Sequence, residues 1–297
     1  AFLTTLFDAA VARADPMLCL AEHLPPKPKG RLIVIGAGKA SARMGEALEA
    51  VYGPCEGLIV TRYGYARPCK GIEIVEAAHP VPDQAGVIAT QRILDLVRDL
   101  GPDDQVIALI SDGLSLADKK SLNAALLASG MPISQMNIVR KQVSAVKGGK
   151  LAAAVYPAKL LTLMISDVPG DDPSEIASGP SVGSVATAAM ALVALRQWRV
   201  ALPDHIMQII TNAPTPIAPD DPRLSTSQTR IIAAPAHSLA AAAALAGDID
   251  IRILGDAIEG EARTLGQVHA ALAMQIAAEK NTRPVLLLSG GECTVTR

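Results

Sequence analysis

The chain has 297 residues, a formal net charge of −2 and a hydrophobic content of 50%, while only 2% of its residues are aromatic. This length fits one large domain, or a large domain with part of a second. A balanced charge and so few aromatic rings argue against a nucleic-acid-binding surface. No apolar run reaches the roughly 18–20 residues that span a bilayer, which argues against a membrane protein. The 4 cysteines stand far apart without metal-ligand spacing, so we expect reduced thiols and a cytoplasmic location.

Short β-branched runs alternate along the chain with longer helical patterns, which is typical of βα units around a mainly parallel sheet. The first residues, AFLTTLFDAAVARADP, predict an amphipathic helix. The strands expected next are Arg31–Ile35, Gly57–Val60, Ile72–Glu76, Gln105–Ile110 and Leu160–Ile165. The helices expected between them are Ala40–Val51, Gln84–Leu100, Leu116–Ser129 and Gln135–Val146.

A segment rich in Pro, Asp and Thr, Ala213–Leu224, predicts a connector between this series and a second one. The second series consists of the strand Arg230–Ala233, the helix Ser238–Ala246, the strand Asp250–Leu254, the helix Glu259–Ala278 and the strand Pro284–Leu288. We therefore expect an α/β protein with a larger Rossmann-like domain in residues 1–224, built on a mainly parallel sheet with flanking helices. Residues 225–297 are expected to begin a smaller, incomplete α/β domain, or to supply return strands of the first domain.

The segment RLIVIGAGKAS, residues 31–41, joins a hydrophobic strand to a helix through a glycine turn. Gly36 and Gly38 let the backbone approach a ligand closely, and the free N–H groups at a helix start favour anions. Lys39 is informative because a cation at a helix start opposes the helix dipole unless an anion compensates it. The segment predicts an anion-binding turn, and a merely tight strand–helix turn is the alternative.

The same segment departs from both common nucleotide-binding motifs. It is not a Walker A loop, because its glycines are two apart and Ala40 stands where Ser or Thr would ligate Mg²⁺. It is not a complete dinucleotide-binding motif, because Ser41 replaces the third glycine. The second strand ends in Thr61 and Arg62 where an acidic residue is expected, although Arg62 could meet an NADP 2′-phosphate.

Acidic side chains crowd the segment SDVPGDDPSEIASGP, residues 166–180, which directly follows a buried strand. They are Asp167, Asp171, Asp172 and Glu175. Clustered carboxylates repel one another, so the arrangement is costly without a cation or a substrate proton to compensate it. The carboxyl end of a parallel strand is also where open α/β sheets place their ligands. The loop therefore predicts part of an active site, with Ser178-Gly179 as a small anion nest and a solvated acidic loop as the alternative.

The segment MNIVRKQVSAVKGGKLA, residues 136–152, places polar and basic side chains three, four and seven residues apart. This spacing puts Asn137, Arg140 and Lys141 near one helical face. Lys147 is expected at the end of the helix, before Gly148-Gly149, where an ordinary helix cap would look the same. The residues alone leave a binding helix and an ordinary cap open.

Taken in order, these segments resemble the glycerate 2-kinase family, whose C-terminal half is called the MOFRL domain and whose members are often labelled hydroxypyruvate reductases. The resembling pieces are IGAGKAS, EAAHPVPD, LNAALLASGMPISQMNIVRKQVSAVKGGKLA, ISDVPGDDPSEIASGP, ILGDAIEGEA and LLLSGGECTV. The chain departs from the family pattern after Ser111, where a Gly/Ser-rich SGGGS loop is usual and Asp112-Gly113-Leu114-Ser115 stands here. The family pattern also continues well past SGGECTV.

The resemblance implies transfer of the γ-phosphoryl group of ATP, with Mg²⁺, to the 2-hydroxyl of D-glycerate, which gives 2-phosphoglycerate. It implies a larger Rossmann-like domain and a smaller α/β domain with the site in the cleft between them. Lys39 would stabilise charge on the transferring phosphoryl group. Asp167 would orient or deprotonate the glycerate hydroxyl, or hold the metal together with Asp171.

Further binding roles follow from the same resemblance. Arg140 would pair with the glycerate carboxylate in two-point fashion, and the turns at 148–149 and 178–179 would offer N–H groups to phosphates. The residues expected to bind substrate or phosphate are Gly36, Gly38, Ser111, Asn137, Arg140, Lys147, Gly148, Gly149, Ser178 and Gly179.

Two other functions stay open. An NAD(P)H-dependent hydroxypyruvate reductase, with NADH or NADPH as cofactor, is favoured by the family label and by the strand–G-x-G–helix start. The incomplete dinucleotide motif and the acids around Asp167 oppose it. A non-catalytic sugar-phosphate-binding module would need the anion-binding turn but not the acidic loop. All three functions involve a small-molecule ligand, and the residues leave a homo-oligomer open.

Overall fold

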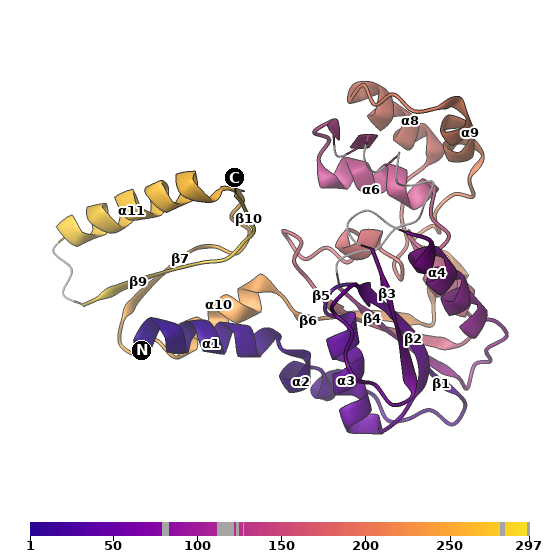
Figure 1. The fold of residues 1–297 in the computed structure, drawn as a ribbon, viewed down its shortest axis with the longest axis horizontal. Helices are drawn as coiled ribbons and strands as arrows, with labels where there is room; N and C mark the ends of the chain where they lie inside the picture. The colour runs from indigo at the N-terminus through magenta and orange to yellow at the C-terminus, as the bar shows by residue number, and fades with distance from the viewer. Residues whose placement is uncertain (79–82, 112–121, 123–124, 127, 280–282, 296–297) are drawn as a thin grey trace.

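A six-stranded parallel sheet, of order β3-β2-β1-β4-β5-β6, forms the centre of the molecule (Figure 1). The computed structural model describes residues 1–78, 83–111, 122, 125–126, 128–279 and 283–295. The strands are β1 (Leu32–Ala37), β2 (Glu56–Arg62), β3 (Ile72–Ala77), β4 (Gln105–Ile110), β5 (Lys159–Ile165) and β6 (Ser227–Ala233). This is the strand order of dinucleotide-binding folds. The expected α/β architecture on a mainly parallel sheet is confirmed.

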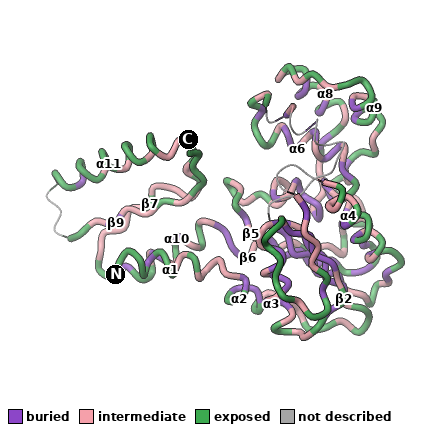
Figure 2. Tube along the Cα trace, viewed as in Figure 1, coloured by how far each residue is buried: buried purple, intermediate pink, exposed green. Residues whose placement is uncertain are grey.

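The sheet strands are continuous apolar runs because both faces of the sheet are covered. Along β1, Ile33 and Ile35 face one apolar layer and Val34 faces the other, since successive side chains of a strand point to opposite faces. The first layer is closed by α4 (Gln84–Leu96) and α7 (Lys150–Val155), the second by α2 (Pro16–Cys19) and α3 (Ser41–Tyr52). Figure 2 shows the buried residues gathered in these strands.

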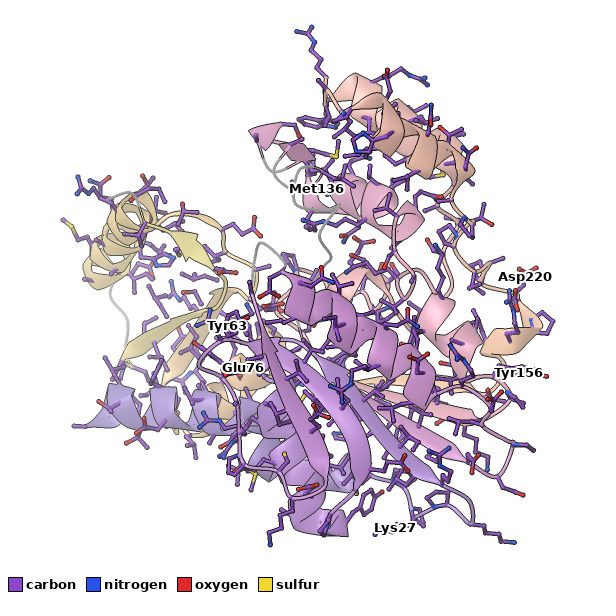
Figure 3. All side chains as sticks on the ribbon, turned by 45° about the vertical axis from the view of Figure 1, so that its right-hand side comes forward. Lys27, Tyr63, Glu76, Met136, Tyr156 and Asp220 are labelled. Carbon is purple, nitrogen blue, oxygen red and sulfur yellow. The ribbon has the colours of Figure 1, made fainter. Side chains whose placement is uncertain are left out.

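Helices α6 (Ile133–Gln142), α8 (Ala188–Gln197) and α9 (Asp204–Asn212) pack around a separate apolar core, and we call these helices the cap. The cap lies beyond the carboxyl ends of the sheet strands (Figure 1). In Figure 3, Met136 of α6 marks this end and Lys27, which precedes β1, marks the opposite end. The helix expected at 135–146 ends at Gln142. The helix expected at 116–129 lies mostly outside the described residues.

A C-terminal unit stands apart from the sheet, and it includes the first helix of the chain. Strands β7 (Asp250–Gly255) and β9 (Val285–Ser289) pair in parallel, with Leu286 packed against Leu6 of the first helix and Ala242. Figure 1 shows α1 and α10 side by side in this unit. The other members of the unit are α1 (Phe2–Ala14), α10 (Pro235–Ala244), β8 (Gly260–Glu261), α11 (Ala262–Ala278) and β10 (Cys293–Thr294).

The two options left open for residues 225–297 therefore apply to different strands. Strand β6 pairs with β5 and is the sixth strand of the main sheet, whereas β7 and β9 form a sheet of their own. We propose a domain boundary just after β6 rather than at 224, with α1 assigned to the C-terminal unit. Among the described residues, short 3-10 turns also occur at Ala21–His23, Ile176–Ser178 and Pro222–Leu224. Within the described part of the chain, none of the helices has the length and apolarity needed to cross a membrane.

The carboxylate of Glu49 ties the end of α3 to the segments that lead into β2 and β3. Its Oε1 accepts hydrogen bonds from the backbone N–H groups of Cys55, Gly71 and Ile72 at 3.2, 2.7 and 2.9 Å, and its Oε2 accepts one from Lys70. Burial acts to raise the pKa of Glu49, but these backbone hydrogen bonds outweigh it and the pKa lies below its ordinary value.

Replacing Glu49 with Gln should lower the free energy of unfolding at pH 7 by about 1–3 kcal/mol, because the amide N–H₂ group meets a backbone donor. The folded-state pKa is depressed, so the stabilisation is present above the unfolded pKa of about 4.3 and is lost as the pH falls through the folded value. Urea unfolding of both proteins at pH 7 and near pH 3 measures this. A difference in unfolding free energy between the two proteins that stays constant with pH would contradict this prediction. Glu22→Gln is the control, because Glu22 is exposed and its replacement should change the unfolding free energy little.

Candidate active site

Loops from three neighbouring strands meet at the carboxyl edge of the sheet. Lys39 follows β1, Ser111 follows β4 and Asp167 follows β5, and these strands are adjacent and parallel. The Nζ atom of Lys39 lies 3.2 Å from Oδ2 of Asp167, with the two side chains 36% and 41% exposed. The structure thus brings together the two residues expected to be catalytic. So exposed an ion pair contributes at most about 1 kcal/mol to stability.

The turn after β1 packs against the end of β4 with no room for a side chain. Gly38 has a φ of +129°, and a Cβ atom there would lie 2.0 Å from the carbonyl oxygen of Ser111. The N–H of Ala40 donates to Ser111 Oγ at 2.9 Å, which fixes the start of α3. Gly36 similarly allows close strand packing, since its Cβ would lie 2.7 Å from the Leu109 carbonyl oxygen. These contacts set the position from which Lys39 projects.

The same contacts involve backbone donors of the turn expected to bind an anion. The N–H of Gly38 donates to the Val60 carbonyl at 3.0 Å, and the N–H of Ser41 donates to the Gly38 carbonyl at 3.3 Å. With the N–H of Ala40 held by Ser111, these donors of the turn are used within the protein. We therefore assign Gly36, Gly38 and Ser111 to positioning Lys39 rather than to direct phosphate binding.

The two glycine turns expected to bind phosphates bind each other. The N–H groups of Gly148 and Gly149 donate to the carbonyls of Ser178 and Gly179 at 3.1 and 2.8 Å. The N–H groups of Ser178 and Gly179 donate in turn to the carbonyls of Glu175 and Ile176. The expectation that these turns offer N–H groups to phosphates is not met in this structure, because the amides join the loop after α6 to the loop after β5.

Lys147 and its surroundings also differ from the sequence prediction. Because α6 ends at Gln142, Lys147 lies in the following loop, where its Nζ donates to the Ala177 carbonyl at 2.8 Å and to Ser178 Oγ at 3.3 Å. The end of α6 is capped by Lys150, whose Nζ donates to the carbonyls of Lys141 and Ser144. Burial lowers the pKa of Lys150.

A buried polar cluster links α6 to the acidic loop. Asn137, which is 2% exposed, donates from Nδ2 to Glu175 Oε2 at 2.6 Å and accepts at Oδ1 from Ser178 Oγ at 2.8 Å. Arg140 Nη1 lies 3.4 Å from the same Oδ1. Lys141 pairs with Glu175 at 3.2 Å. Glu175 was expected among the crowded acids of the loop and Lys141 on the helical face of Asn137, but neither residue was given a specific role.

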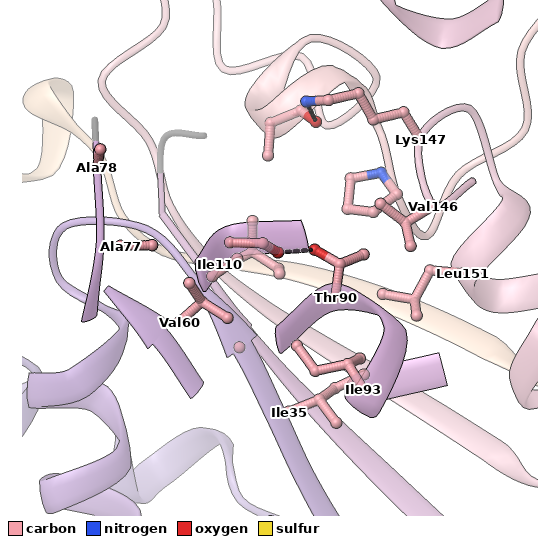
Figure 4. Close-up of a pocket in the computed structure, with 15 residues that line it drawn as sticks. Ile35, Val60, Ala77, Ala78, Thr90, Ile93, Ile110, Val146, Lys147 and Leu151 are labelled. Atoms are coloured by element: carbon pink, nitrogen blue, oxygen red, sulfur yellow. Dashed lines mark hydrogen bonds between the residues drawn. The ribbon is translucent and has the colours of Figure 1, made fainter. Parts of the chain in front are cut away.

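An apolar cavity of about 70 Å³ lies under this cluster, at the carboxyl ends of β1 to β4 (Figure 4). Its walls include Ile35, Val60, Ile110 and Leu151, and Lys147 lies at its rim. Segments from four of the sequence motifs line it: residues 35–37, 77–78, 146–147 and 177 with 180. A cavity with such walls suits a small ligand that carries an apolar surface.

A second cavity, of about 110 Å³, is acidic and lies between the loop after β5 and the C-terminal unit. Asp167 and Asp171 line it from one side, and Asp256, Glu259 and Glu292 from the other. The carboxylates of the C-terminal unit have no predicted role, because a local pattern does not show which distant loop they will face. Asp171 has a φ of +53°, and its Oδ1 is buried without a hydrogen-bond partner.

Known proteins resemble this chain over most of its length. Residues 2–211 match the family described as "Domain of unknown function (DUF4147)". The D-glycerate 2-kinase of Thermotoga maritima is 33% identical over 94% of this chain and 70% of its own length. The chain belongs to the glycerate 2-kinase family.

Two further relatives show the range of names in this family. A crystal structure of glycerate kinase from Thermotoga maritima superposes with a TM-score of 0.85 at 30% identity, over 99% of this chain and 74% of that one. A protein of Agrobacterium vitis, provisionally named a hydroxypyruvate reductase, is 48% identical over 99% of this chain and 70% of its own length. The departure from the family pattern after Ser111, at residues 112–115, lies outside the described residues.

Replacing Gly38 with Ala tests the close approach to Ser111. The variant should lose about 1–3 kcal/mol of unfolding free energy beyond the cost of a positive φ, because the new Cβ overlaps a backbone oxygen. Gly53→Ala is a matched control, since Gly53 has a φ of +75° but open space around its Cβ position. Chemical unfolding of both variants measures the difference. Equal destabilisation by the two substitutions would show that the contact does not constrain the turn.

Proposed function

We propose that this protein is a glycerate 2-kinase that transfers the γ-phosphoryl group of ATP to the 2-hydroxyl of D-glycerate, giving 2-phosphoglycerate. The observation that carries the proposal is the Lys39–Asp167 pair at the carboxyl edge of the sheet, with an acidic cleft beside it. Phosphoryl transfer needs little covalent chemistry from a protein, so positioning and charge neutralisation are the main requirements. The names of the relatives support the same reaction.

The pair supplies the two charges that the reaction requires. The ammonium of Lys39 neutralises the oxygens of the phosphoryl group as negative charge is redistributed during transfer. The carboxylate of Asp167, once Lys39 turns to the phosphates, would orient the 2-hydroxyl and accept its proton. Arg140 is the residue we assign to the glycerate carboxylate, because a guanidinium can form two parallel hydrogen bonds to it.

The oxygen-rich acidic cleft fits Mg²⁺ as the companion of ATP. Asp171 Oδ1 is buried and lacks a hydrogen-bond partner, and carboxylate oxygens are the ligands that Mg²⁺ prefers. Among the described residues no group of three His, Cys, Asp or Glu side chains is already arranged to hold a metal. Asp167 and Asp171 would therefore hold the ion together with nucleotide phosphates, and the bound ion would neutralise phosphate charge.

The reductase alternative is favoured by the name of one relative and by the strand order. The local structure of the turn opposes it. A dinucleotide pyrophosphate needs free N–H groups at the start of α3, and those of Gly38 and Ala40 are bonded to Val60 and Ser111. Incubation with hydroxypyruvate and NADPH decides between the two: steady loss of NADPH absorbance without ATP would establish the reductase.

Lys39→Ala and Asp167→Asn should each lower glycerate-dependent ADP formation about 100-fold or more, because each removes a charge that acts on the transferring group. Both side chains are partly exposed, so the variants should unfold at nearly the wild-type urea concentration. A coupled assay for ADP with D-glycerate and Mg-ATP gives the rates.

Matched controls lie at the opposite edge of the sheet. Lys159→Ala and Asp103→Asn remove the same charges from exposed positions near the starts of β5 and β4. These variants should keep wild-type rates. Wild-type turnover in Lys39→Ala or in Asp167→Asn would remove that residue from the mechanism.

A further inference from the structure

Glu175 joins the loop after β5 to helix α6 of the cap. Its two carboxylate oxygens bind two side chains one helical turn apart, Asn137 at 2.6 Å and Lys141 at 3.2 Å. Asn137 is 2% exposed and Lys141 5%, so these bonds lie in an environment of low dielectric, where they are strong if complete and costly if broken. One carboxylate therefore controls how α6 faces the acidic loop.

The carboxylate also decides which way the Asn137 amide points. A carboxylate can only accept hydrogen bonds, so the amide nitrogen of Asn137 must face Glu175. Its oxygen is thereby turned to the other side, where it accepts from Ser178 Oγ at 2.8 Å and from Arg140 Nη1 at 3.4 Å. The reversed amide would set its oxygen against the carboxylate and its N–H₂ group against the guanidinium.

The network continues to a second cation near the apolar cavity. Ser178 Oγ, which donates to Asn137, lies 3.3 Å from Lys147 Nζ and accepts from it. Lys147 is 6% exposed and lines the rim of the cavity. A chain of hydrogen bonds thus runs from Glu175 through Asn137 to both Arg140 and Lys147.

We propose that Glu175 is a positioning residue, which acts through the amide of Asn137 to hold Arg140 and Lys147 in the geometry that binds the anionic substrate. The proposal rests on the proposed function, because it takes the carboxylate of glycerate as the anion that Arg140 binds. Glu175 does not touch substrate or the reacting atoms. Its effect therefore falls on glycerate binding rather than on the phosphoryl-transfer step.

A merely structural role makes a different prediction. Glu175 also neutralises Lys141, and loss of one partner of a buried ion pair leaves an uncompensated charge. Glu175→Leu alone can therefore lose activity simply because the uncompensated charge of Lys141 destabilises the protein. Replacing both partners with apolar groups removes this penalty, so the double variant K141M/E175L should recover stability. It does not restore the carboxylate acceptor of the Asn137 amide, which retains its longer hydrogen bond, 3.5 Å, to the backbone carbonyl of Glu175.

The test compares steady-state kinetics of wild type, E175L and K141M/E175L. We expect the KM for glycerate to rise about tenfold or more in both variants, with kcat and the KM for ATP within about threefold of wild type. The double variant should unfold at a higher urea concentration than E175L. The exposed pair Arg92–Glu73 supplies the control R92M/E73L, which should leave both KM values unchanged.

The outcomes separate the possible failures. If K141M/E175L recovers stability and its KM for glycerate also returns to the wild-type value, the positioning role is wrong. An equal rise in both KM values would overturn it too. The side-chain N–H₂ resonance of Asn137, assigned by its loss in N137D, should shift in E175L and in K141M/E175L whichever reaction the protein catalyses. If that shift occurs while wild type fails to phosphorylate glycerate, the proposed function fails and the network stands.

Discussion

The close approach of Gly38 to Ser111 is the contact on which the geometry of the candidate site depends. Strands β1 and β4 are neighbours at the point where the strand order reverses, which is where open α/β sheets bind ligands. The turn after β1 reaches this point only because Gly38 lacks a side chain, and the Ser111 hydroxyl then fixes the first turn of α3 through Ala40. Lys39, between these contacts, projects toward Asp167 from a fixed backbone.

Several backbone amides that could have bound phosphate instead hold loops together in this site. The N–H groups of Gly148 and Gly149 clamp the loop after α6 to the loop that carries the acidic residues. In the proposed reaction, the described side chains that recognise anions are above all those of Lys39 and Arg140. Phosphoryl transfer depends mainly on positioning and charge neutralisation, and side-chain cations can supply both.

Patterns within one element were readable from the sequence, and contacts between elements were not. Strand Gln105–Ile110 was predicted to the residue because both of its faces are buried and its apolar run is continuous. Helix α6 was predicted too long, since its end is set by Lys150 from the next helix. Lys39 and Asp167 could be paired because parallel strands end at one edge of the sheet, but no local pattern showed that Glu175 would bind Asn137 of a different element.

In the proposed reaction, Lys39 and Asp167 direct a phosphoryl group to the 2-hydroxyl of glycerate. Phosphorus NMR of the product formed from D-glycerate and Mg-ATP tests it most directly, because the two phosphoglycerate isomers give distinct signals. We predict 2-phosphoglycerate, formed in step with ADP and without any nicotinamide cofactor. A 3-phosphoglycerate signal, or no phosphorylated product from folded protein, would contradict the account.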